Sequence, residues 1–198
     1  MYFLTPQITN LLAISTMVGQ FFLLAFFLLL LINKYKPLNF FNSIIKIITK
    51  FDLYIVFSIA LTGIIFSLFY SEIALLEPCK LCWYQRIVIY PQVIIYGMGI
   101  YLKDKAARVY GMALAILAFL IAGYQYLLQM SAVFKHATAS FTDCSLSIDG
   151  PSCSSYYFLE YGYITIPMMS LTAMAMIIVV LCVSSCSYKV MAKIEDRA

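Results

Sequence analysis

The chain has 198 residues, of which 64% are hydrophobic and only 11% are charged, and its formal net charge is +4 at pH 7. Soluble domains are roughly 45–50% apolar and about 25% charged, so this composition leaves too little polar surface for a chain folded in water. It excludes a disordered protein, a nucleic-acid-binding protein and an ordinary cytosolic enzyme. We therefore expect an all-α, polytopic membrane protein with the bilayer as its solvent.

Stretches without charge define the candidate spans, because a helix needs roughly 17–25 apolar residues to cross the hydrocarbon layer. Five transmembrane helices are predicted, at Leu11–Ile32 within the uncharged stretch 1–33, Leu53–Ser71, Ile87–Leu102, Val109–Phe134 and Tyr161–Tyr188. The third stretch is short and becomes a full span if it starts near Cys82, which brings Arg86 to the membrane edge. No Lys or Arg precedes Lys34, so the first helix lacks the basic start of a signal peptide and is predicted to be retained.

These spans divide the chain into three segments. Residues 1–36 form an N-terminal transmembrane helix, residues 37–50 a cytoplasmic connector, and residues 51–198 a four-helix membrane domain that we expect to be an antiparallel bundle. The connector alternates apolar residues with lysines. It is therefore either an amphipathic helix lying on the inner surface or a plain link.

Basic residues orient the spans, because Lys and Arg gather in short cytoplasmic loops. An outside N-terminus leaves only Lys80, Arg86 and Lys135 on the outer side. The other basic residues then lie inside, namely Lys34, Lys36, Lys46, Lys50, Lys103, Lys105, Arg108, Lys189, Lys193 and Arg197. The sequence predicts an outside N-terminus and a cytoplasmic C-terminus, and the mild positive charge does not indicate a nucleic-acid partner.

Four of the six cysteines fall in the two predicted outer loops. Cys79 and Cys82 form a C-x-x-C motif before the third span, and Cys144 and Cys153 lie between the fourth and fifth spans. Four thiols that meet on the oxidising side of a membrane permit disulfide exchange from pair to pair. Two alternatives stay open: static disulfides in a membrane scaffold or assembly protein, and a four-thiolate zinc site. The remaining two, Cys182 and Cys186, are interpreted as small apolar residues of the last helix.

Arg86 favours the redox interpretation. It follows Cys82 by four residues, so the two share one face of a helix. A cation there lowers the pKa of a thiol and stabilises negative charge on a small acceptor. An acceptor that meets a cysteine at the lipid boundary is itself dissolved in the membrane, and a quinone has this property. Gln85 either donates to a quinone carbonyl or pairs with a polar residue of a neighbouring helix. The alternative role for Arg86 is that of an anchor at the membrane interface.

Two sequence blocks form a specific pattern. The first is Ser71-Glu72-Ile73 followed by Pro78-Cys79-Lys80-Leu81-Cys82-Trp83-Tyr84-Gln85-Arg86, and the second is Cys144 followed by Gly150-Pro151-Ser152-Cys153 and Gly162-Tyr163-Ile164-Thr165-Ile166-Pro167. From about Phe51 to about Ser187 the chain resembles the DsbB family of membrane thiol oxidoreductases, most of all its BdbC-type branch. The resemblance implies an enzyme of the bacterial cytoplasmic (inner) membrane. Such an enzyme reoxidises a DsbA-like thioredoxin-fold thiol oxidase and passes the electrons to a membrane quinone, ubiquinone or menaquinone.

The resemblance also implies roles for single residues. Cys144 would be attacked by the partner thiol, Cys153 would engage Cys79 in an inter-loop disulfide, and Cys82 would meet the quinone beside Arg86. The chain departs from the family in two respects. Where some members carry a histidine before the second cysteine pair, this chain reads Gln125-Tyr126-Leu127-Leu128-Gln129, and we transfer no role to His136. The first helix has no counterpart in the family's four-helix core. An enzyme that runs in the reducing direction, like vitamin K epoxide reductase, is disfavoured because that group places its loop cysteines before its C-x-x-C.

Overall fold

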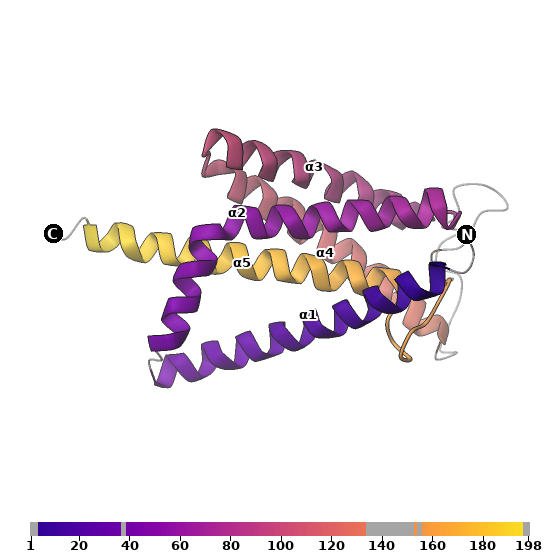
Figure 1. The fold of residues 1–198 in the computed structure, drawn as a ribbon, viewed down its shortest axis with the longest axis horizontal. Coiled ribbons are helices and arrows are strands. Elements are labelled where there is room, and N and C mark those ends of the chain that lie inside the picture. Colours follow the sequence, from indigo (N-terminus) through magenta and orange to yellow (C-terminus); the bar gives the residue numbers. More distant parts are fainter. Residues whose placement is uncertain (1–3, 37–38, 134–152, 154–155, 196–198) are drawn as a thin grey trace.

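Almost all of the chain that the structure describes is helical. The computed structural model describes residues 4–36, 39–133, 153 and 156–195. Within them lie five α-helices, α1 (Leu4–Tyr35), α2 (Asn39–Leu68), α3 (Lys80–Leu102), α4 (Ala106–Val133) and α5 (Ile166–Glu195), and a short π-helix, η1 (Phe69–Ile73), extends α2 (Figure 1). The all-α prediction is confirmed.

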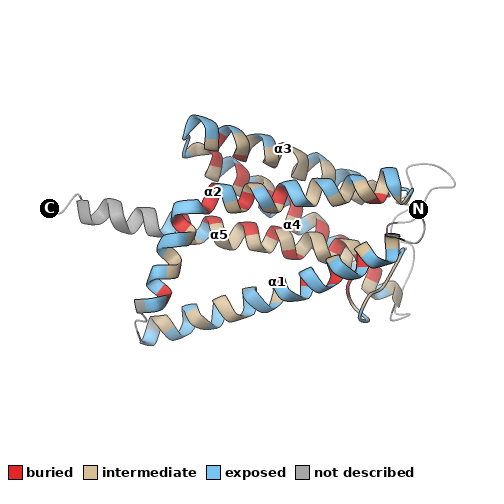
Figure 2. Cartoon of the chain, viewed as in Figure 1, coloured by how far each residue is buried: buried red, intermediate tan, exposed pale blue. Residues whose placement is uncertain are grey.

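Helices α2 to α5 form an antiparallel four-helix bundle. Each packs on its neighbours in the order α2, α3, α4, α5 and back to α2, while α1 rests on α5 (Figure 1). The fully buried side chains Val56, Tyr96, Ala115 and Ile177 lie at its centre. Buried residues lie on the inner faces of the helices, and large apolar side chains are exposed on the outer faces (Figure 2). This distribution of apolar surface is that of a protein whose outside meets lipid.

Small residues bring α3 and α4 close together. A Cβ atom added to Gly111 would lie 2.1 Å from Cε1 of Tyr96, and one added to Gly99 would lie 2.4 Å from Cβ of Ala107. Only glycine permits this approach, which is the usual way that membrane helices gain packing contacts. The two contacts fix how the residues of α3 face those of α4.

Hydropathy supports four of the five predicted spans. The stretches Thr5–Asn33, Phe40–Ile73, Ala106–Val133 and Ile166–Cys186 are long and apolar enough to cross a membrane. Helix α3 is not among them, since polar residues such as Arg86 and Gln92 lower its hydropathy. Its 23 residues nevertheless extend about 34 Å, and it lies between α2 and α4. The chain is a multi-pass membrane protein.

The predicted connector is helical. Residues 39–50 form the first part of α2, which bends at Phe51 (φ −112°, ψ 16°). Figure 1 shows this part running across the end of the bundle, between α1 and the longer part of α2. Phe40 is exposed, whereas Phe41 is buried, with its ring centroid 5.4 Å from that of Phe26 on α1. Of the two interpretations of this segment, the helical one is present; its place on a membrane surface stays a prediction.

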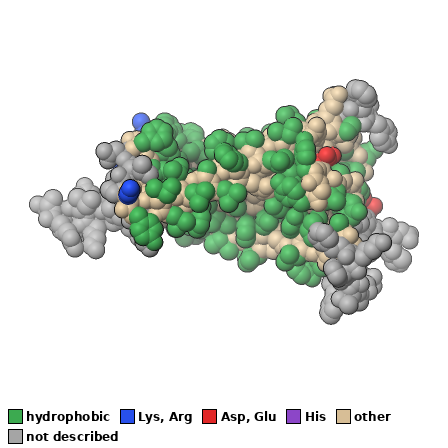
Figure 3. All heavy atoms as spheres, turned by 90° about the horizontal axis from the view of Figure 1, so that it is seen from below, with side chains coloured by type: hydrophobic (Ala, Val, Ile, Leu, Met, Phe, Trp, Pro, Cys, Tyr) green, Lys and Arg blue, Asp and Glu red, His purple; other side chains and the backbone are tan. Residues whose placement is uncertain are grey.

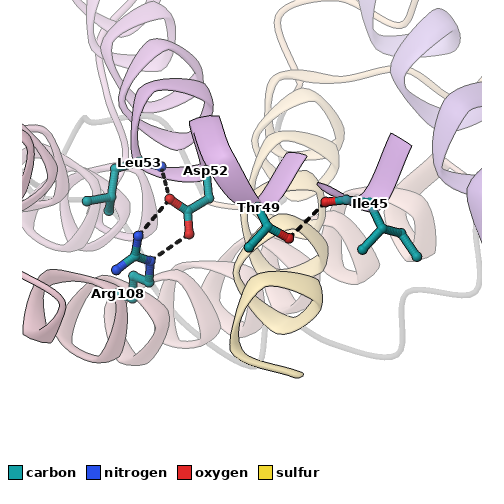
Figure 4. A network of polar contacts seen from close by, with 5 residues as sticks. All are labelled: Ile45, Thr49, Asp52, Leu53 and Arg108. Atoms are coloured by element: carbon teal, nitrogen blue, oxygen red, sulfur yellow. Dashed lines mark hydrogen bonds and ion pairs between the residues drawn. The ribbon is translucent and has the colours of Figure 1, made fainter. Parts of the chain in front are cut away.

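An ion pair fixes the bend in α2 to the start of α4 (Figure 4). Arg108 donates from Nε to Oδ2 of Asp52 at 2.5 Å and from Nη2 to Oδ1 at 3.0 Å, and the backbone N–H of Leu53 also donates to Oδ1, at 2.7 Å. One turn earlier, Thr49 donates to the carbonyl of Ile45 at 2.8 Å. The side chain of Asp52 is only 2% exposed. The bidentate geometry therefore satisfies a buried carboxylate.

Charged side chains gather at the two ends of the molecule. On the face shown in Figure 3 the middle is largely hydrophobic, Lys and Arg are visible at the end where α5 terminates, and Asp and Glu at the opposite end. Cys79 and Cys82 lie at the start of α3, away from the turn at residues 103–105.

Candidate thiol site and its cavity

The two cysteines of the C-x-x-C motif meet at the start of α3. Cys79 is the N-cap residue, with extended backbone (φ −72°, ψ 172°), and its carbonyl accepts from the backbone N–H of Trp83 at 3.1 Å. Cys82 lies in the first turn. Both are free thiols, and their sulfurs are 3.1 Å apart. A disulfide bond is about 2.05 Å long, so the pair can close with a small movement of the side chains.

Cys153 packs against this pair. Its side chain and that of Cys79 are 2% and 5% exposed, and together they form a small apolar cluster with Leu81, Cys82 and Leu128. Cys153 is disulfide-bonded, whereas Cys79 is free. The Cys79–Cys153 disulfide implied by the family resemblance is therefore not the one in this structure, although the two residues share one cluster.

Three of the four predicted redox cysteines thus lie together. The fourth, Cys144, lies outside the described residues, and so does His136.

Gln125 on α4 is a site residue that the sequence analysis missed. Its side-chain nitrogen donates to the sulfurs of both Cys79 and Cys82, at 3.3 Å each. Gln85 in turn donates to the side-chain oxygen of Gln125 at 2.6 Å. Of the two roles expected for Gln85, the polar contact between helices is present, and its contact with a quinone stays a prediction. A signal was present in the sequence: Gln125 is one of the few polar residues of α4 and lies in the region where some family members carry a histidine.

These contacts shift the pKa values of the two thiols in opposite directions. Both cysteines lie before the uncharged segment 87–102 of α3, which is the part of this helix predicted to span the membrane. The hydrogen bond from the Cys79 thiol lowers the pKa of Cys82, and the bond from Gln125 and the charge of Arg86 lower it further, against the opposing effect of burial. The same hydrogen bond and burial raise the pKa of Cys79. Cys82 is therefore the thiol that ionises first. The effect that the sequence analysis assigned to Arg86 comes mainly from Cys79.

Arg86 is held against the end of α2. Its Nε and Nη2 donate to the hydroxyl and the carbonyl of Ser67, both at 3.0 Å, and its guanidinium carbon lies 5.2 Å from the ring centroid of Trp83. The guanidinium group carries five N–H donors in a rigid fork. The Ser67 contacts fix the direction of this fork, and Arg86 also lines the neighbouring cavity.

A cavity of about 440 Å³ begins at the thiols and extends between the helices. Cys79, Cys82, Arg86 and Gln125 border it at one end, and most of its remaining wall is apolar. Thr165 also lines it, and the hydroxyl oxygen of this residue is buried with no hydrogen-bond partner among the described residues. Ligand sites in proteins usually have this size and this combination of apolar walls with a few polar groups.

The segment before α5 covers this end of the cavity. Tyr157 donates to the carbonyl of Glu77 at 2.6 Å, and the ring of Phe158 lies 5.7 Å from that of Tyr70. These contacts join the chain that follows Cys153 to the chain that precedes Cys79. They hold the two cysteine-bearing loops together.

Comparison with known proteins agrees with this geometry. Residues 50–187 match the family model described as "Disulfide bond formation protein DsbB". "Probable disulfide formation protein C 2" of Bacillus anthracis is 37% identical over 135 residues, which cover 68% of this chain and 91% of that protein. "Disulfide bond formation protein C" of Bacillus subtilis is 35% identical over 130 residues, with 66% and 89% covered.

A third relative matches to a similar extent. "Probable disulfide formation protein" of Chlamydia muridarum is 38% identical over 130 residues, with 65% of this chain and 88% of that protein covered. No solved structure matches the chain. The family match covers α2 from residue 50 onward, α3, α4, α5 up to residue 187 and both cysteine pairs, and on this ground the chain belongs to the DsbB family of disulfide bond formation proteins.

Proposed function

We propose that this chain is a membrane thiol-disulfide oxidoreductase that reoxidises a DsbA-like thioredoxin-fold partner and passes the electrons to a membrane quinone. One observation carries the proposal: the Cys79/Cys82 pair contacts the disulfide-bonded Cys153 and also borders the cavity that contains Arg86. A dithiol in this position can exchange with a disulfide on one side and reach a lipid-soluble oxidant on the other. The curated relatives, which are named disulfide formation proteins, support the first half of this route.

In the first step the outer cysteine pair takes electrons from the partner. A partner thiolate attacks the sulfur of Cys144 and displaces Cys153 as a thiolate, which forms a mixed disulfide. The second partner thiol then displaces Cys144. The partner leaves as a disulfide, and Cys144 and Cys153 remain as two thiols, so two electrons and two protons have been transferred.

In the second step the outer pair reduces the oxidised form of the inner pair. The Cys153 thiolate attacks the sulfur of Cys79, with which it shares the apolar cluster, and Cys82 leaves. Thiols of low pKa leave faster, and the pKa of Cys82 is lowered by Cys79 and Gln125. Attack by Cys144 on Cys153 then restores the outer disulfide and releases Cys79 as a thiol.

The cavity suits the ring of ubiquinone or menaquinone. A quinone bound there would accept two electrons and two protons from the Cys79 and Cys82 thiols, which would form the inner disulfide again. Cys82 borders the cavity as the more acidic thiol, and the guanidinium N–H groups of Arg86 are donors for a carbonyl oxygen. The unpartnered hydroxyl of Thr165 is a further donor. The largely apolar wall of the cavity strengthens the hydrogen bonds of these groups.

The proposed location is the bacterial cytoplasmic (inner) membrane, with the cysteine loops on the extracytoplasmic side. The N-terminus is then outside and the C-terminus cytoplasmic. The separation of acidic and basic side chains in Figure 3 supports this orientation, because the basic end lies away from the thiols.

Purified protein tests the proposal directly. Given a reduced thioredoxin-fold partner and a short-chain quinone, it should oxidise the partner and bleach the quinone absorbance. Cys82→Ser should abolish quinone reduction, whereas Cys182→Ser, which changes an exposed thiol of α5, should not. Unchanged turnover in Cys82→Ser would contradict the assignment.

Thiol trapping in membranes separates this enzyme from a scaffold protein with static disulfides. Depletion of quinone should convert the Cys79/Cys82 pair to thiols in the enzyme. Structural disulfides would stay oxidised under the same conditions.

A further inference from the structure

The cavity has a second end, far from the thiols. Arg86 contacts Ser67 at the thiol end, and the lining residues of α2 continue back to Ser58, nine residues earlier. At 1.5 Å per residue this is about 14 Å along the helix. We call this part the inner arm; its walls are Leu12, Ser15, Thr16 and Gly19 of α1, Ser58, Ile59, Thr62 and Gly63 of α2, and Ala173 and Met176 of α5.

The inner arm is lined by small and aliphatic residues and offers few hydrogen-bond donors. Each of three hydroxyl groups donates to a carbonyl of its own helix: Ser15 to Leu11 at 2.9 Å, Ser58 to Tyr54 at 2.9 Å, and Thr62 to Ser58 at 2.8 Å. With their donors used in this way, the hydroxyls present compact, weakly polar surface. An aliphatic chain can lie against such walls without leaving a donor unpaired.

Gly63 leaves the arm open on the α2 side. A Cβ atom added there would meet nothing within 4 Å. Ser15, Ser58 and Thr62 are exposed, so the arm reaches the outer surface of the bundle between α1 and α2. In a membrane that surface faces lipid.

Specific contacts hold α1 as a wall of this arm. Tyr163 donates to the side-chain oxygen of Gln20 at 2.9 Å, and the nitrogen of Gln20 donates to Thr172 on α5 at 3.2 Å. Nearer the outer end, Tyr70 donates to Thr9 at 3.2 Å. Helix α1 precedes residue 50, where the family match begins, so this wall is an addition to the part shared with the family.

We infer that the inner arm holds the isoprenoid tail of the quinone and that α1 is a tail-binding wall. The inference rests on the proposed function. With the ring at Cys82 and Arg86, the tail would run along Gly63 and Ser15 and pass into the bilayer between α1 and α2. The polar groups of the cavity lie at the ring end and the donor-poor walls at the tail end, which matches the two halves of such a molecule.

The experiment compares a tail-less benzoquinone with the same ring carrying a decyl chain. Gly63→Leu fills the arm, and Ser15→Leu narrows it from α1. Each should raise the KM for the decyl quinone about tenfold and change that for the tail-less quinone less than about twofold. Matched controls are Ile65→Phe and Val18→Leu, which add bulk at lipid-facing positions of the same helices; neither should alter the ratio of the two KM values.

Turnover of the tail-less quinone shows in each variant that the protein is folded and the ring site intact. An unchanged KM ratio in Gly63→Leu and Ser15→Leu, or an equal loss for both quinones, would overturn the tail inference and leave the proposed function standing. Failure of the unmodified protein to reduce either quinone would overturn the proposed function itself.

Discussion

The side-chain nitrogen of Gln125 lies 3.3 Å from the sulfur of Cys82, so a residue of α4 holds the more acidic thiol of α3. The same nitrogen is 3.3 Å from the sulfur of Cys79. A donor shared between two sulfurs stabilises negative charge on whichever of them ionises. Gln125 is therefore a positioning residue for the whole pair.

Replacing Gln125 should raise the pKa of Cys82. A lowered pKa keeps the thiolate present at lower pH than for an ordinary cysteine, whose pKa is about 8.5, so loss of the donor moves thiolate formation to higher pH. In Gln125→Met, the pH curve for alkylation of Cys82 by iodoacetamide, followed by mass spectrometry, should shift upward. Gln92→Met, a buried substitution elsewhere on α3, should leave it unchanged. A curve that does not move in Gln125→Met would contradict this role.

Arg86→Gln should weaken quinone use and spare the exchange with the partner. The Ser67 contacts fix the guanidinium fork at the cavity wall, and a charged hydrogen bond there contributes enough for about a tenfold rise in the KM for quinone. Arg86→Lys should not restore the KM, because an ammonium group cannot reproduce the fork. Single-turnover oxidation of the partner without added quinone is the second measurement. An effect confined to that step would place Arg86 elsewhere in the mechanism.

Breaking the Asp52–Arg108 pair should destabilise the fold. Asp52→Asn leaves Arg108 without its carboxylate in a poorly solvated place, and loss of one partner of a buried pair costs about 3–5 kcal/mol. The free energy of unfolding in mixed detergent micelles measures the loss. Asp104→Asn is the control, because Asp104 is exposed and asparagine also caps the following helix. Asp52→Asn combined with Arg108→Gln should cost less than the two single changes added together.

Gly111→Ala should separate α3 from α4. The added methyl group would overlap the ring of Tyr96, and overpacking of this kind costs about 1–3 kcal/mol. Gly123→Ala is a matched control in the same helix, since its Cβ would make only an ordinary 3.5 Å contact with Leu171. Thermal unfolding in detergent compares the two variants. Combining Gly111→Ala with Tyr96→Leu should recover part of the loss, and full additivity would argue against the overlap.

The sequence was sufficient to predict the helices and the position of Cys82 and Arg86 at one site. Uncharged stretches locate the spans because the hydrocarbon layer excludes charge, and the four-residue spacing of Cys82 and Arg86 places both at the same cavity. The contacts of Gln125 with the two sulfurs could not be predicted, because they depend on the axial position of α4 relative to α3. That alignment follows from the Gly111 and Gly99 contacts, which appear only in three dimensions. The role of α1 as a cavity wall was hidden for the same reason.

The burial of Cys79 and Cys153 has a consequence for the cell. With 5% and 2% of these side chains exposed, small soluble thiols and peroxides have little access to either sulfur. In the proposed function, the oxidation state of Cys79 would then be set by its immediate neighbours and not by the redox buffer around the protein. Electrons accepted at the loops would pass to the cavity without loss to soluble oxidants.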